Sequence, residues 1–210
     1  YESRAASGSV IEDGDSSLPD GRSFGVYAYQ VGFDESVPGK VEVFKNPATS
    51  SATAFPNREV STSDGVAGYS PKVLWPHLST GRSLRFFAYY PWTDQNRSDK
   101  AITVTQSAAA EQVSIGYKMS GDPSKHIDLM HWMGPRNTTE NTVNVELGHS
   151  LARLKFQARM QLYSPGTRIE VTNIEIGQAV SEGTLNISPS GDRINAVWNL
   201  NSTSKTSLAM

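Results

Sequence analysis

Apolar and polar residues alternate with a period of two along much of this chain. The clearest run has Leu154, Phe156, Ala158, Met160 and Leu162 on one side, with charged and amide residues between them. Such alternation is typical of a half-buried β-strand with one apolar face. The pattern therefore predicts a strand over residues 154–162 whose apolar side chains lie in a core.

Eight further segments are rich in aromatic and β-branched residues, which favour strands. They cover residues 24–31, 41–44, 72–75, 84–90, 101–105, 143–147, 168–176 and 194–198. Turn signals such as Pro38-Gly39, Asp64-Gly65 and Ser190-Gly191 separate them. The one helix candidate, residues 107–112, is short. Strands at this spacing predict an all-β fold, a sandwich or barrel of antiparallel sheets.

Two polar stretches divide the chain. Residues 1–20 are rich in Ser, Gly and Asp and predict a flexible N-terminal segment. Residues 134–141, GPRNTTEN, hold no apolar residue beyond Gly and Pro and separate two strand-rich regions. We therefore expect one β-sandwich domain over residues 21–141 and a second over residues 142–210.

The second predicted domain has too few strands to cover both faces of a sandwich core. An isolated sheet of that size would leave apolar rows and unpaired edge groups in water. We therefore expect this domain to be incomplete as it stands. Either residues beyond Met210 or a strand from another chain would complete it.

The composition excludes several classes of protein. The formal net charge is −2, without basic clusters, which argues against nucleic acid as a partner. The chain has no cysteine, so disulfides and thiolate chemistry are excluded. No apolar run approaches the length of a membrane-spanning helix. Ser and Thr supply much of the polarity, which suits strands and turns better than helices.

One segment resembles a catalytic motif. Gly148-His149-Ser150-Leu151-Ala152 is close to the nucleophile elbow G-x-S-x-G, which requires a following helix and then a histidine later in the chain. The next segment alternates like a strand, and no histidine follows His149. We therefore expect no catalytic role for Ser150 and no enzyme activity.

No metal or cofactor site is expected. His126 and His131 lie five residues apart, which puts them on opposite faces of a strand, and the zinc motif H-E-x-x-H is absent. The Gly-rich phosphate-binding motifs G-x-G-x-x-G and G-x-x-x-x-G-K are absent as well.

The four tryptophans leave a second hypothesis open. Together with the tyrosines, Trp75, Trp92, Trp132 and Trp198 could form a sugar-stacking platform, as in carbohydrate-binding or adhesin modules of this size. The competing interpretation is that these aromatic residues lie in the core of the sandwich.

Three segments, in order, carry a resemblance to a known family. They are GRSFGVYAY from Gly21, a tryptophan at position 75 followed by FFAYYP, and DLM from Asp128 followed by VELGHSLARLKF from Val145. Their order and spacing resemble the fimbrillin-like family, subunits of the type V pili of Bacteroidales. The match runs from about residue 21 to about residue 200. Gly148 departs from the family pattern, in which a larger residue precedes the histidine.

The resemblance implies two tandem transthyretin-like β-sandwich domains in a structural subunit of a cell-surface fimbria that serves adhesion. It also implies export as a lipoprotein precursor, a lipid anchor at the outer membrane, and other pilus subunits as partners, with a host glycan or protein as a further partner. Subunits would assemble by strand donation after a protease cuts behind an arginine and releases the first strand. Arg4 is the candidate processing site.

Overall fold

The computed structural model describes residues 18–45, 54–74, 76, 81–107, 111–138, 142–152, 154, 156–157, 166, 170–191 and 193–209. These residues form antiparallel strands, turns and one short 3-10 helix, η2 (Pro123–Lys125), which confirms the all-β prediction. The strands are β1 (Ser23–Val31), β2 (Val41–Val43), β3 (Arg58–Ser63), β4 (Val66–Gly68), β5 (Ser83–Tyr90), β6 (Ile102–Ser107), β7 (Gln112–Lys118), β8 (Met130–Met133), β9 (Gly148–His149), β10 (Glu175–Val180), β11 (Glu182–Ser190), β12 (Arg193–Leu200) and β13 (Lys205–Ala209). No helix in the described part of the chain is long and apolar enough to cross a membrane.

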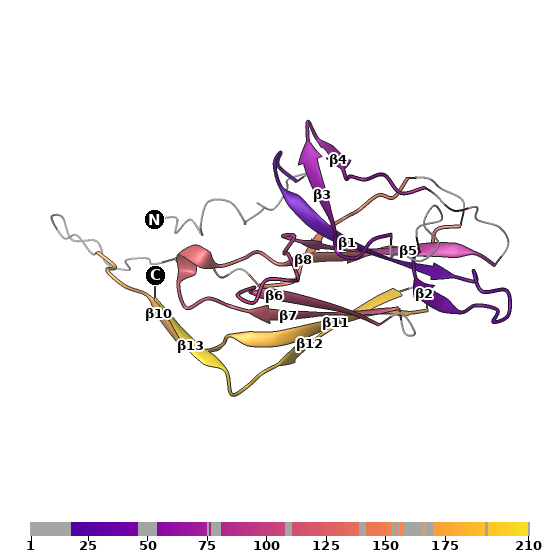
Figure 1. Cartoon of the computed structure of the whole chain (residues 1–210). Helices are drawn as coiled ribbons and strands as arrows, with labels where there is room; N and C mark the ends of the chain where they lie inside the picture. Colours follow the sequence, from indigo (N-terminus) through magenta and orange to yellow (C-terminus); the bar gives the residue numbers. More distant parts are fainter. Residues whose placement is uncertain are drawn as a thin grey trace.

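The larger layer is a seven-stranded antiparallel sheet (Figure 1). Its strand order is β4-β3-β1-β5-β8-β9, and β2 pairs with β1 as well. β1 and β5 are central and are buried on both faces: every residue of β5 is buried, and all but the first residue of β1. Such strands need apolar side chains on both sides, which explains the near-continuous aromatic runs of these two segments.

The smaller layer is a four-stranded antiparallel sheet in the order β12-β11-β7-β6, which packs below the larger one (Figure 1). β7 pairs with β11 over six residue pairs, among them Ile115 with Leu185. β6 and β7 precede the expected domain boundary at residues 134–141, whereas β11 and β12 follow it. Strands from both sides of that boundary therefore share one sheet, and the division into two domains stays a prediction.

The core between the two sheets is aromatic on one side and mostly aliphatic on the other. Tyr27, Tyr29, Phe87 and Tyr89 of the larger sheet face Ile102, Val113, Ile115, Leu185 and Ile187 of the smaller one, all of them buried. The hydroxyl of Tyr29 donates to the carbonyl oxygen of Gln112 at 2.8 Å and so joins the two sheets. The larger sheet has a second buried face, which segments without regular structure cover.

The second buried face of the larger sheet explains why residues 143–147 alternate like a strand. In the segment 143–147, Val143, Val145 and Leu147 are half-buried against the apolar cluster around Phe86, as the alternation predicts. The segment nevertheless pairs with no strand in the described structure; the ladder begins only at Gly148, in β9. In this segment the alternation reflects packing against an apolar face. It does not show that the segment belongs to a sheet.

Several sequence predictions on strands and helices are wrong. Residues 72–74 form no strand, and in the region 168–176 the strand begins only at Glu175. The helix expected at 107–112 is also wrong where the structure describes it, since Ser107 ends β6 and Gln112 begins β7. Trp75 and residues 108–110 lie outside the described residues.

The clearest alternating run of the sequence is not a buried strand at its described positions. Leu154 is 66% exposed and Phe156 is 48% exposed, and neither residue is paired. Ala158, Met160 and Leu162 lie outside the described residues. An amphipathic pattern shows that a segment has one face suited to burial. It does not show that the fold provides a surface against which that face packs.

Candidate functional site at a strand edge

The four-stranded sheet ends in β12, and in the described part of the chain no strand pairs with β12 on the side away from β11. β11 and β12 pair along their whole length, from Gly183 with Leu200 to Ser190 with Arg193. The outer edge of β12 is thus eight residues long. An edge of this kind is a template for a further strand.

The register shows which backbone groups face that edge. The amide of Asn201, directly after β12, donates to the carbonyl oxygen of Glu182 at 2.9 Å. Backbone groups of successive strand residues point to opposite sides. Arg193, Asn195, Val197 and Asn199 therefore bond to β11, whereas the amides and carbonyls of Ile194, Ala196, Trp198 and Leu200 point outward.

The edge-facing residues also direct their side chains to the inner face of the sheet. Ile194 and Trp198 are half-buried against the core between the sheets. Ala196 is exposed, and Leu200 is 63% exposed. None of these four residues is charged. The edge thus has neither the inward-pointing charge nor the proline with which proteins commonly protect an exposed strand.

Trp198 fixes β12 to the rest of the sandwich. Its indole Nε1 donates to the carbonyl oxygen of Ser150 at 3.0 Å, and its ring contacts the edge of Tyr117 at 6.5 Å between centroids. The amide of Ser150 in turn donates to the carbonyl oxygen of Leu129 at 2.8 Å. These contacts hold the edge in position before any partner binds.

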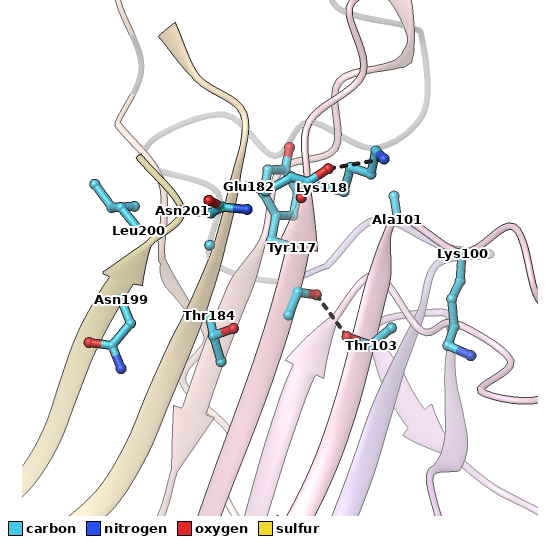
Figure 2. Close-up of a pocket in the computed structure, with 12 residues that line it drawn as sticks. Lys100, Ala101, Thr103, Tyr117, Lys118, Glu182, Thr184, Asn199, Leu200 and Asn201 are labelled. Carbon is cyan, nitrogen blue, oxygen red and sulfur yellow. Dashed lines mark hydrogen bonds and ion pairs between the residues drawn. The ribbon is translucent and has the colours of Figure 1, made fainter. Parts of the chain in front are cut away.

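A shallow depression of about 570 Å³ lies on the outer face of this sheet, where β12 ends (Figure 2). Its lining is mixed, and its polar part includes the hydroxyls of Thr103 and Thr184 and an ion pair of 3.0 Å between Lys118 and Glu182. The hydrogen bond from Lys118 lowers the pKa of the Glu182 carboxyl. A Cβ at Gly116 in the floor would clash with the Thr103 hydroxyl oxygen, so a larger residue there would require the Thr103 side chain to rotate.

The depression has no exposed aromatic ring among its described lining. Tyr117 is 8% exposed and belongs to the core between the sheets. Trp132 and Trp198 pack against the two apolar clusters, and the indole of Trp92 donates to the carbonyl oxygen of Asn57 at 3.2 Å. Trp75 lies outside the described residues. These contacts favour the interpretation of the tryptophans as packing residues.

The structure brings Ser150 to a histidine that sequence reasoning overlooked. Nδ1 of His131 and Oγ of Ser150 are joined by a hydrogen bond of 2.7 Å. Our sequence argument considered only histidines that follow the serine, whereas His131 precedes it. The pairing of β8 with β9 brings the two together, since it opposes His131 to Gly148.

The described residues do not complete a hydrolase site around this pair. A catalytic triad needs a carboxylate on the histidine that contacts the serine, whereas Oδ1 of Asp128 lies 2.9 Å from Nδ1 of His149. The amide of Ser150 already donates to Leu129, so it does not point toward a substrate oxygen. The contact of Ser150 with His131 therefore serves to hold residues 148–151 against β8.

We expect the stability of the protein to fall in mild acid because of His131. Burial lowers the pKa of this imidazole. The folded state therefore favours the neutral imidazole. The contribution of His131 to the free energy of unfolding is complete above its pKa in the unfolded chain, about 6.5. It is lost as the pH falls through the lower pKa of the folded state. Urea unfolding at about pH 7.5 and about pH 5 measures how much the free energy of unfolding falls in acid. The fall should be smaller for His131→Asn than for the unchanged chain. An equal fall in both proteins would contradict this prediction.

The other candidate residues do not converge on a site. Arg4, the expected processing site, lies outside the described residues. Nε2 of His126 contacts the carbonyl oxygen of Ser120 at 2.9 Å, so His126 and His131 have different partners. Among the described residues no group of three or more His, Asp or Glu side chains could hold a metal ion.

Comparison with known proteins gave one match. A family model described as "Fimbrillin-like" matches residues 12–209, nearly the whole chain. No curated protein and no solved structure matches.

Proposed function

The chain belongs to the fimbrillin-like family, a family of structural, fimbria-related proteins, and on this premise we propose that it is a fimbrial subunit that accepts a β-strand from another subunit along β12. The family implies a cell-surface location and association with other fimbrial subunits. Strand donation, adhesion and a lipid anchor on the precursor belong to the proposal.

The edge of β12, which no strand in the described part of the chain covers, is the observation that carries this proposal. A strand added there would bond to the outward amides and carbonyls of Ile194, Ala196, Trp198 and Leu200. Its apolar side chains would cover the exposed Ala196 and Leu200 on the inner face. Each side chain buried in this way contributes roughly 1.5–3 kcal/mol, in addition to the backbone bonds.

Proteolysis behind Arg4 is the proposed trigger. An arginine-specific protease should convert the purified chain into concentration-dependent ladders on a denaturing gel. The variant Arg4→Ala should stay monomeric under the same treatment, whereas Arg22→Ala, the next arginine in the sequence, should polymerise normally. Ladders of equal intensity from all three chains would contradict a role for Arg4.

A charge at the β12 edge should block assembly. In Ala196→Lys the new ammonium would lie on the inner face of the added strand, where desolvation disfavours it. We expect at least a roughly tenfold loss of polymer. Asn195→Lys is the matched control, because this side chain lies on the outer face and its backbone bonds to β11. Equal losses in both variants would exclude β12 as the acceptor.

The resemblance also implies two tandem transthyretin-like domains, divided at residue 141, and this remains a proposal. The pairing of β11 with β7 favours a sheet shared across that point. The stability of a chain that ends at residue 141 decides between the two arrangements.

A further inference from the structure

The opposite edge of the four-stranded sheet, β6, is not open in the same way. The side-chain oxygen Oε1 of Gln95 accepts the amide of Val104 at 2.9 Å. The side-chain nitrogen Nε2 of Gln95 donates to the carbonyl oxygen of Ile102 at 3.5 Å. One amide side chain thus binds two successive outward backbone groups of this strand.

These two groups are among those that a further strand would use. The amide of Lys118 donates to the carbonyl oxygen of Ala101 at 2.9 Å, so Ala101, Thr103 and Thr105 face β7. Ile102, Val104 and Gln106 therefore face the free edge. A residue in a parallel neighbouring strand would donate to Ile102 and accept from Val104, which is the pattern that Gln95 reproduces.

Gln95 is held firmly in this position. Its Nε2 also donates to the carbonyl oxygen of Thr93 at 3.0 Å. The ammonium of Lys100 donates to the backbone oxygen of Gln95 at 2.8 Å. Asp94 accepts the amide of Asn96 at 2.9 Å and so fixes the turn directly after Gln95. A residue fixed from three sides excludes a competing strand better than a mobile side chain would.

We propose that Gln95 is an edge-blocking residue that prevents a second copy of this chain from adding a strand to β6. The inference rests on the proposed function in one respect. If β6 is blocked, strand addition to this sheet takes place at β12. Because β12 is then the one open edge of this sheet among the described strands, subunits join in a line and do not associate at random through both edges.

The test uses the absence of cysteine from the chain. Thr105 is exposed on the outer face of β6, so Thr105→Cys reports on contacts between two β6 edges. With Gln95 present, a short bismaleimide should give little cross-linked dimer. With Gln95→Ala added, we expect the dimer fraction to rise at least roughly tenfold. An unchanged fraction would overturn the proposal.

Gln95→Met is the second variant, because it keeps a side chain of similar length and removes both polar atoms. It should cross-link like Gln95→Ala if edge blocking is the role of Gln95. Cross-linking only when the variant has also lost its cooperative melting would show that Gln95 serves stability and would overturn the proposal.

A separate readout keeps this test distinct from the proposed function. Val197 is 47% exposed on the outer face of β12, and Val197→Cys labelled with an environment-sensitive fluorophore, with Gln95 unchanged, reports on strand addition at that edge. An emission spectrum that assembly leaves unchanged would count against strand addition at β12. The comparison at position 105 would still decide the role of Gln95.

Discussion

Phe87→Ala is expected to lower the free energy of unfolding by about 3–5 kcal/mol, enough to remove much of the stability of a domain. Phe87 is fully buried in β5. Its ring lies 6.3 Å from the rings of Tyr27 and Tyr89, between centroids, on the face that meets the smaller sheet. Truncation would therefore remove apolar contacts and leave a cavity that rigid neighbouring strands cannot close. Urea unfolding monitored by circular dichroism measures the change.

Phe156→Ala is the matched control for this prediction. The alternation of the sequence predicts that Phe156 is buried, whereas the structure shows it 48% exposed. We expect a loss below about 1 kcal/mol. Equal losses at Phe87 and Phe156 would contradict the burial described here.

A chain that ends at residue 141 is expected to lack cooperative thermal unfolding. It loses β11, whose Leu185 and Ile187 are buried, and uncovers Val113 and Ile115 of β7. Four such side chains at roughly 1.5–3 kcal/mol each amount to most of the usual 5–15 kcal/mol of domain stability. Calorimetry of the shortened chain measures the effect.

A chain that ends at residue 201 is the control. It lacks β13, the partner of β10 in a separate two-stranded ribbon, but keeps the four-stranded sheet intact. We expect it to unfold cooperatively. A cooperative transition of the 141-residue chain near that of the full chain would instead show that the first predicted domain folds alone.

The sequence predicted the central strands well. The aromatic runs of β1 and β5 are long enough to signal strands on their own, and β6 and β12 follow from alternation and turn signals. β7 carried a usable signal that our reasoning missed, since Val113, Ile115 and Tyr117 alternate with Ser114 and Gly116. In β11, Leu185 and Ile187 alternate with polar residues in the same way, and our reasoning missed this signal as well.

The candidate site could be predicted only in part. The sequence predicts a second domain with too few strands after residue 141, and this division stays a prediction. It does not indicate which strand forms the edge of the four-stranded sheet, because the pairing of β11 with β7 joins residues about 70 positions apart. The contact of Gln95 with β6 has no signature in the sequence, since it depends on how one turn packs against one edge.

Residue-resolved hydrogen exchange of β12 tests the central claim most directly. In the monomer, the amides of Ile194, Ala196 and Trp198 should exchange quickly, while those of Asn195 and Val197, bonded to β11, should exchange slowly. In assembled material the amides of Ile194, Ala196 and Trp198 should become protected as well, because carbonyl oxygens of the added strand accept hydrogen bonds from them. Assembly that leaves the exchange of Ile194, Ala196 and Trp198 unchanged would contradict strand addition at β12.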